Sequence, residues 1–226
     1  MSKKVFILGT GHWDLLEVPW EEKAEFWQLN NAYEDDAMNM DKVTRWFDLH
    51  TDERRRRRWQ TKQIEWLEEE HDFPVYMQEA SKRHPSAVEF PIDKIGKKLM
   101  KTKLQWGDSA VQRWFGCSHA FMTAFAIYEG FKEIEYRGIH LMNPVEVYME
   151  RPSFFYWLGQ ANARGIKTII PESSYLLWDQ TYAYDERVPE QWMPKSIAMY
   201  VYTIERFGDL LGVTDEKLEK QLLEFD

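Results

Sequence analysis

Short apolar runs alternate with polar or amphipathic stretches along most of the chain. Apolar residues recur with a period of two in some segments and with a helical period in others. Runs of strand length predict strands at 3–8, 25–29, 45–49, 73–77, 134–139 and 166–170. Helical spacing predicts helices at 51–72, 117–130, 153–165, 195–211 and 214–225. This alternation is typical of an α/β fold in which helices flank a mostly parallel sheet, here with a helical C-terminal extension.

The clearest helix and strand follow each other within segment 117–141. Small and aromatic residues recur there at helical spacing, which predicts a helix packed against a sheet, and Gly130 would end it. The alternating run 134–139 then predicts a strand whose carboxyl end delivers Gly138 and His140 to a loop. Ligands of open α/β sheets bind at the carboxyl ends of strands, so a site is expected there.

The chain has 226 residues, of which 44% are hydrophobic, and this is enough for one substantial core. We expect one domain over 1–177. Residues 178–226 would add an aromatic loop and the two C-terminal helices, packed on the same domain. Those helices could also mediate homo-oligomerisation.

Composition narrows the class of protein further. No apolar run approaches the ~20 residues of a membrane span, and the first one is too short for a signal peptide, so a cytoplasmic protein without a membrane partner is expected. The single cysteine, Cys117, excludes an internal disulfide framework and a multi-cysteine metal site. A net charge of −9 argues against broad nonspecific nucleic-acid binding. The 11 tryptophans could fill the core or line a stacking cleft.

The first predicted strand ends in Gly9, Thr10 and Gly11. A strand followed by a glycine-rich turn is typical of nucleotide-binding sheets, because glycines let backbone N–H groups approach a phosphate. The third glycine of the dinucleotide fingerprint is missing, and no Gly-Lys-Ser/Thr follows. A simple tight turn is the alternative interpretation.

Polar side chains also follow the next two strands. Asn30 and Asn31 come after 25–29, and their amides could bind ribose, a base edge or phosphate, or serve as ordinary turn residues. Asp48 and His50 alternate out of 45–49, and the pair could hold a metal, perform acid–base chemistry or cap the next helix. No third ligand is in view, so no metal site is assigned and the sequence does not require a divalent metal.

Five consecutive arginines, 54–58, lie near the start of predicted helix 51–72. Wound on a helix they spread around it, and a solvated surface paired with the glutamates that follow is one interpretation. The other is that two or three of them reach a phosphate or nucleic acid. Their place near a helix N-terminus is unfavourable for the helix dipole, which favours an interaction role.

The second half of the chain adds further candidates. Ser118 and His119 would lie at the N-terminus of helix 117–130, where N–H groups and the dipole favour an anion. The loop 141–152 is dense in side chains capable of chemistry: Glu146, Tyr148, Glu150 and Arg151.

Several of these stretches carry a resemblance to known families: VFILGTGHW, EFWQLNNAY, AFAIYEGFKEIEYRGIHL and VYMERPSFFYWLGQANARGIKTIIPESS. Together they resemble a group of uncharacterised bacteriophage proteins. Those proteins are similar to the Rossmann-like domain of motility accessory factors and archaeal 6-hydroxymethylpterin diphosphokinase-like proteins, and more distantly to Campylobacter-type sialyltransferases. The resemblance covers residues 3–177, and a phage protein would work in the host cell cytoplasm.

The resemblance implies a Rossmann-like, nucleotide-binding, transferase-like fold. Its implied ligand contacts are the phosphates at Gly9, Thr10 and Gly11, the nucleoside near Asn30 and Asn31, and the rest of the pocket from Ser118, Gly138, Glu146, Tyr148 and Arg151. This chain departs from the pattern at two places. The first loop has Gly11-His12-Trp13 where relatives commonly have Gly-Pro-Ser, and Gly138-Ile139-His140 replaces Gly-x-Asp, which removes a carboxylate.

The leading hypothesis is a transferase that binds a nucleotide or nucleotide sugar and transfers a glycosyl or phosphoryl group. Arg151 or Arg137 would offset the diphosphate charge, and His140, His119 or Glu150 would act as general base. Nucleic acid could enter only as one possible acceptor, beside a glycan or a small metabolite. A non-catalytic nucleotide binder acting against host defence and a structural or assembly protein of the virion are the alternatives.

Overall fold

The computed structural model describes residues 3–57, 61–100, 114–142 and 146–177. Its strands form one seven-stranded sheet in the order β5-β4-β3-β2-β1-β6-β7, and every pairing is parallel. The strands are β1 (Lys4–Leu8), β2 (Glu25–Leu29), β3 (Arg45–Phe47), β4 (Val75–Met77), β5 (Ala87–Glu89), β6 (Glu133–Arg137) and β7 (Lys167–Ile169). The predicted α/β fold with a parallel sheet is confirmed.

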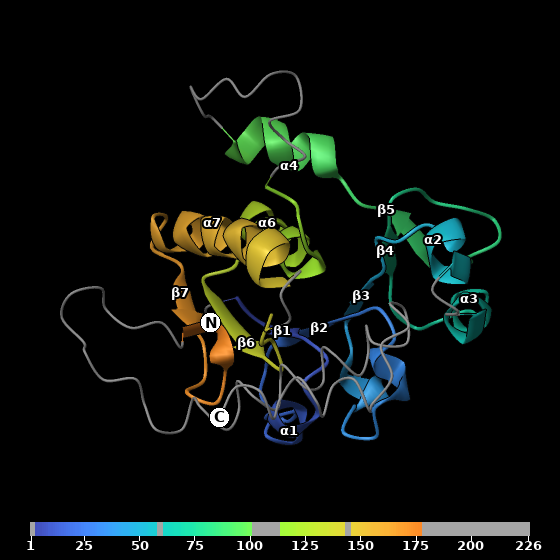
Figure 1. Cartoon of the computed structure of the whole chain (residues 1–226), viewed down its shortest axis with the longest axis horizontal. Helices are drawn as coiled ribbons and strands as arrows, with labels where there is room; N and C mark the ends of the chain where they lie inside the picture. Colours follow the sequence, from blue (N-terminus) through green and yellow to red (C-terminus); the bar gives the residue numbers. More distant parts are fainter. Residues whose placement is uncertain (1–2, 58–60, 101–113, 143–145, 178–226) are drawn as a thin grey trace, which may run out of the picture. The chain divides into compact units, whose positions relative to one another are not determined.

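Helices cover both faces of this sheet (Figure 1). One face packs against α4 (Ile92–Leu99), α6 (Ser118–Glu129) and α7 (Arg151–Asn162), and the other against α1 (His12–Leu16) and α3 (Thr61–Leu67). The remaining described helical segments are short: η1 (Ala32–Glu34), η2 (Met40–Lys42), α2 (Asp52–Arg57), the π-helical turn η3 (Glu146–Glu150) and η4 (Tyr175–Leu177).

The central strand β1 shows why the apolar runs form the sheet. Val5 and Ile7 point to the face covered by α6 and α7, while Phe6 and Leu8 point to α1, and all four are fully buried. A strand buried on both faces is apolar at every position rather than at alternate ones. The run 3–8 has this character, which is why it was recognisable in the sequence.

Three tryptophans lie in the core: Trp27, Trp46 and Trp157 have no exposed surface. Trp27 packs with its ring centroid 5.6 Å from that of Phe125 and 5.2 Å from that of Phe131. Such contacts between aromatic rings add to the stabilisation from buried area. For these three residues the core-filling interpretation of the tryptophans is confirmed.

Helix α6 ends at Gly130 as predicted. Gly130 adopts a left-handed conformation with φ of +81°, and the N–H of Phe131 donates to the carbonyl of Ala126 at 3.1 Å. This is the geometry in which glycine closes a helix, because a Cβ is unfavourable at positive φ. The chain then turns directly into β6, beside β1.

Two predicted element boundaries are wrong, and one strand was missed. Predicted helix 51–72 is described as α2 and α3 and is no longer helical after Leu67, where the ring of His71 folds back to place Nε2 2.9 Å from the carbonyl oxygen of Trp66. Helix α7 begins at Arg151, so Ser153 lies inside it, and the Ser153 hydroxyl instead accepts the Gly116 N–H at 3.0 Å. Strand β5 was not predicted, because it has only three residues and two of them are exposed.

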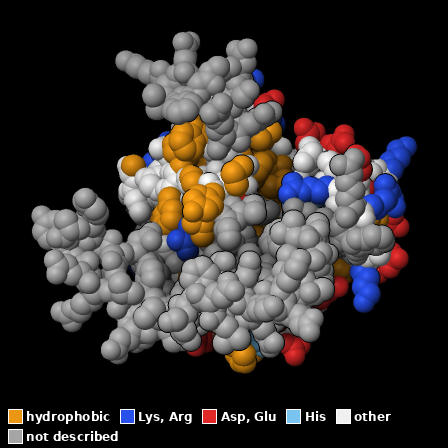
Figure 2. All heavy atoms as spheres, viewed as in Figure 1, with side chains coloured by type: hydrophobic (Ala, Val, Ile, Leu, Met, Phe, Trp, Pro, Cys, Tyr) orange, Lys and Arg blue, Asp and Glu red, His pale blue; other side chains and the backbone are white. Residues whose placement is uncertain are grey.

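Figure 2 shows charged side chains of both signs gathered around α2 and α3, and apolar ones over the part of the molecule occupied by α6 and α7. Within the described part of the chain no helix is long and apolar enough to cross a membrane. The C-terminal helices at 195–211 and 214–225, the aromatic loop before them and any oligomer they would form lie outside the described residues, and the division at 177 stays a prediction.

Candidate functional site

A cavity of about 390 Å³ opens at the carboxyl ends of the strands. The loops that follow β1, β2, β3 and β4 line it, together with the N-terminus of α6 and the turn η3. The predicted site residues that it brings together are Thr10, Asn30, Asn31, His50, Ser118, His119, Glu146 and Glu150. The other predicted residues do not line it: Gly9, Gly11, Asp48, Gly138, His140, Tyr148 and Arg151.

Asn30, the residue that follows the carboxyl end of β2, has an unusual backbone conformation. Its φ is +53°, in the left-handed region, and its backbone is fixed by a donated bond to the carbonyl of Phe47 (3.0 Å) and an accepted bond from Trp46 Nε1 (3.1 Å). The side-chain Oδ1 is buried and has no hydrogen-bond partner among the described residues. A constrained residue with an unsatisfied acceptor at a cavity is typical of a ligand contact.

His119 contributes a second set of unsatisfied atoms at the start of α6. Neither ring nitrogen has a partner within the described chain, and both are buried. Burial lowers the pKa of His119 to about 4, so its imidazole is neutral at pH 7 and offers one donor and one acceptor. Cys117, the residue that caps α6, makes no side-chain capping bond, which leaves the helix N-terminus suited to an anion.

The low pKa of His119 predicts a pH effect on stability. The unfolded chain takes up the proton near the ordinary value of 6.5 and the folded chain near 4, so stability is complete above pH 6.5 and falls as the pH drops toward 4. Urea unfolding at pH 7 and pH 5 should show a smaller loss in His119→Phe than in the wild-type protein. Burial also lowers the pKa values of His84 and His140, but these residues contribute equally to the loss of stability in both proteins. Equal losses would contradict the assignment.

The arginine run is divided between two roles. Arg54 lines the cavity, whereas Arg55 has no exposed surface, so the interpretation of the whole run as solvated surface is wrong at Arg55. Arg55 binds Asp48, with Nη2 2.6 Å from Oδ1 and Nε 3.3 Å from Oδ2. Asp48 is therefore engaged in a buried ion pair rather than exposed to the cavity.

The glycines of the first loop meet the loop after β6. The N–H of Gly9 donates to Arg137 O at 2.7 Å and that of Gly11 to Gly138 O at 2.9 Å, so neither N–H is available to a phosphate in this structure. A Cβ on Gly9 would lie 2.1 Å from Gly138 O, and one on Gly11 would lie 2.7 Å from Nε2 of His140. Close approach of two backbones accounts for these glycines.

Gly9→Ala is therefore expected to destabilise the fold by about 1–3 kcal/mol or more, since the added methyl must displace backbone. Gly159→Ala is the matched control, because this glycine is exposed in α7 and its Cβ would meet nothing within 4 Å. There the change should be neutral or stabilising by roughly 0.5–1 kcal/mol. Urea unfolding of both variants measures the difference, and a tolerated Gly9→Ala would refute the packing role.

His140 does not line the cavity and lies near a carboxylate that sequence reasoning missed. Its Nε2 lies 3.8 Å from Oδ2 of buried Asp14, its Nδ1 accepts the Tyr175 N–H at 3.4 Å, and burial lowers its pKa. Asp14 also accepts the N–H of Gly138 at 3.2 Å. The available signal was an acidic residue within the apolar helix HWDLL.

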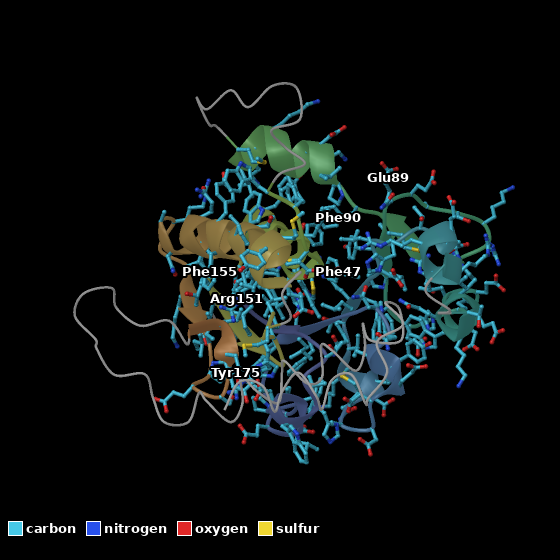
Figure 3. The ribbon with its side chains drawn as sticks, in the orientation of Figure 1. Phe47, Glu89, Phe90, Arg151, Phe155 and Tyr175 are labelled. Atoms are coloured by element: carbon cyan, nitrogen blue, oxygen red, sulfur yellow. The ribbon has the colours of Figure 1, made fainter. Side chains whose placement is uncertain are left out.

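Arg151 and Tyr148 also lie outside the cavity lining. The Arg151 guanidinium donates to the carbonyls of Leu141 (2.8 Å), His140 (3.3 Å) and Tyr175 (3.0 Å); Arg151 and Tyr175 are labelled in Figure 3. It thereby holds Leu141, which lines the cavity, at a φ of +48°. Tyr148 is 79% exposed.

Glu146 and Glu150, the first and last residues of η3, add two carboxylates to the cavity lining. Burial, with smaller contributions from the charges of Glu150 and Glu146, raises the pKa of the Cys117 thiol to about 12. The thiol therefore stays protonated and is unsuited to act as a nucleophile. Phe115 and Phe121, with ring centroids 4.6 Å apart, add an aromatic wall that the sequence did not single out.

A second pocket of about 190 Å³ shares His50 and Gln78 with the cavity. His84 lines it, is 5% exposed, and has no hydrogen-bond partner for either ring nitrogen among the described residues. Burial lowers the pKa of His84, which favours its neutral form. Asp52 and Ser81 add a carboxylate and a hydroxyl, so this pocket is rich in groups that bind hydroxyls.

One group of described side chains has the composition of a metal site: His12, Asp35 and Asp36, whose ligand atoms lie within 4.8 Å of one another. None of them lines the cavity. His12 Nδ1 lies 2.7 Å from Asp35 Oδ1, and this hydrogen bond raises the pKa of the imidazole. In this structure that nitrogen is therefore engaged by the Asp35 carboxylate.

The structure defines a Rossmann-like α/β fold with a cavity at the carboxyl ends of its strands. No family model matches the sequence, and no curated protein matches it. Among solved structures it is similar to the Campylobacter jejuni sialyltransferase CstII in complex with the substrate analogue CMP-3FNeuAc, with 17% identity, a TM-score of 0.50 and coverage of 87% of this chain and 99% of that one.

Two further structures give the same result. The apo form of an alpha-2,3-sialyltransferase from Campylobacter jejuni has 11% identity and a TM-score of 0.50, with 91% of this chain and 95% of that one covered. The monofunctional alpha-2,3-sialyltransferase Cst-I of the same organism has 12% identity and a TM-score of 0.50, with 92% of this chain and 96% of that one covered. At these identities the likeness confirms the predicted fold, and with it the fold-level resemblance to Campylobacter sialyltransferases.

Proposed function

We propose that this chain binds a nucleotide sugar in the cavity and transfers its glycosyl group to an acceptor hydroxyl. The observation that carries the proposal is the meeting of unsatisfied buried polar atoms, those of Asn30 and His119, with a helix N-terminus, an arginine and two carboxylates. Cytidine nucleotides are the first ligands to test, because CstII was solved with CMP-3FNeuAc.

Each wall of the cavity has a part in this function. The amide of Asn30 and the neutral imidazole of His119 would hydrogen-bond the nucleoside, and the rings of Phe115 and Phe121 offer apolar surface to it. The N–H groups at the start of α6 and the guanidinium of Arg54 would hold the phosphate.

Glu146 or Glu150 would act as the general base. Its carboxylate takes the proton of the acceptor hydroxyl as that oxygen forms a bond to the anomeric carbon. The bond between the anomeric carbon and the phosphate oxygen breaks, and the nucleotide leaves with the electron pair. Arg54 and the α6 N-terminus would stabilise the charge that develops on the leaving phosphate.

The acceptor would enter through the second pocket, which adjoins the cavity at His50 and Gln78. Its acceptor groups and neutral His84 suit a ligand rich in hydroxyls, such as a glycan. A phosphate-rich acceptor fits less well, since two carboxylates, Asp52 and Glu79, line this pocket with one guanidinium, Arg55, that is already paired with Asp48 and Asp52.

Calorimetry with CMP, CMP-sugar, UDP and UDP-sugar tests the binding step. Asn30→Gly removes the amide while permitting the left-handed backbone, and should weaken binding by about tenfold, the cost of one buried hydrogen bond of roughly 1.4 kcal/mol. Asn39→Gly is the control, because Asn39 does not line the cavity, and its affinity should match the wild-type value. No affinity for any of these nucleotides would refute the proposal.

A further inference from the structure

The turn between β3 and α2 rests on a buried charged network. Asp48 and Arg55 both have fully buried side chains, and the guanidinium binds both carboxylate oxygens, at 2.6 and 3.3 Å. Gln63 of α3 donates to the same carboxylate, and Asp52 accepts from Arg55 Nη1 at 2.6 Å. The network thus joins β3, α2 and α3.

The same network fixes the backbone of the turn. Asp48 Oδ1 accepts the N–H of His50 at 3.2 Å, and Gln78 Nε2 donates to the carbonyl of Leu49 at 2.7 Å. The N–H of Arg54 donates to Thr51 Oγ1 at 3.2 Å. Leu49, His50 and Arg54 all line the cavity, so the network lies behind one of its walls.

Orientation is the property that such a pair supplies best. A buried ion pair is commonly no more stabilising than well-packed apolar residues, because both charges lose their hydration. A bidentate arginine–carboxylate contact does, however, fix direction. Successive helical residues differ by about 100°, so an inward Arg55 sets the direction of Arg54.

We propose that Asp48 and Arg55 are positioning residues that hold His50 and Arg54 in the cavity wall. The action of Arg54 on a phosphate rests on the proposed function, whereas the positioning of the turn does not. Two neighbouring arginines of the run therefore have different roles: Arg55 positions the turn, and Arg54 contacts the ligand.

Hydrogen–deuterium exchange tests the positioning without a ligand. Arg55→Lys keeps the charge but loses the bidentate contact with the carboxylate. Amide exchange in 49–54 should then rise at least tenfold, while β1 and α6 keep wild-type rates. The double variant Asp48→Leu with Arg55→Met restores an apolar contact and should show the same local rise in a stably folded protein. Unchanged exchange in 49–54, or a uniform rise over the chain, would overturn the proposal.

A double-mutant cycle tests the link to Arg54, with CMP as the probe. Arg54→Gln should weaken CMP binding about tenfold in the wild-type background and less than twofold in the Asp48→Leu/Arg55→Met background. Equal losses in both backgrounds would overturn the positioning role. Absence of CMP binding by the wild-type protein would instead count against the cytidine nucleotide, and the exchange experiment would still decide the positioning.

Discussion

Replacing both cavity carboxylates, as Glu146→Gln with Glu150→Gln, is expected to lower the rate of glycosyl transfer by about 10²–10⁴-fold. The amides keep the shape of the side chains but cannot accept the proton of the acceptor hydroxyl. Nucleotide affinity should stay within about threefold, because neither group is needed to bind the phosphate. Initial rates and calorimetry on the same preparations measure the two effects.

The control for this pair is Glu172→Gln, which removes an exposed carboxylate that does not line the cavity and should leave the rate unchanged. The two single variants assign the base, since only one of them should show the full loss. If the double variant transferred the sugar at the wild-type rate, the general base would lie elsewhere, and His119 and His50 would be the next cavity residues to test.

Arg55→Met alone is expected to lower the free energy of unfolding by about 3–5 kcal/mol, because the Asp48 carboxylate would stay buried without its counter-charge. Arg56→Met is the matched control from the same run. The Arg56 side chain is 54% exposed and 3.9 Å from Asp52, and its loss should cost less than about 1 kcal/mol. Urea unfolding of both variants measures the contrast, and equal small effects would show that the buried pair contributes little.

The parts of the fold that could be predicted are those in which the residue types of a segment directly reflect its burial or its backbone conformation. Strands β1 and β6 are mostly buried and read as strand-length runs, and the end of α6 is marked by a glycine that the backbone requires. Strand β5 gives no such signal, because its pairing with β4 rather than its own side chains makes it a strand.

The site shows the same division. Asn30, Ser118, His119, Glu146 and Glu150 were predicted from chemistry at element ends, and the cavity brings them together. Arg55 could not be singled out within identical neighbours, because its burial depends on the position of Asp48, the residue that follows β3. Gly9 and Gly11 give the same local pattern whether a phosphate or another backbone approaches, and only the position of Gly138 distinguishes the two.

The departure at His140 has a structural counterpart. The position that carries a carboxylate in the resembling families holds an imidazole here, and Asp14 places a carboxylate 3.8 Å from it. His140 and Asp14 lie at the contact of the first loop with the loop after β6, outside the cavity lining. The absence of a carboxylate at 140 therefore does not change the cavity lining, which holds Glu146 and Glu150.

The most direct test is release of CMP from a CMP-sugar by the purified chain, followed by mass spectrometry with and without a panel of glycan acceptors. Transfer predicts CMP release above the buffer rate, a product heavier than the acceptor by one sugar, and loss of both in the Glu146→Gln/Glu150→Gln variant. Tight binding of the nucleotide sugar without any release would contradict transfer and identify a nucleotide-binding protein without catalytic activity.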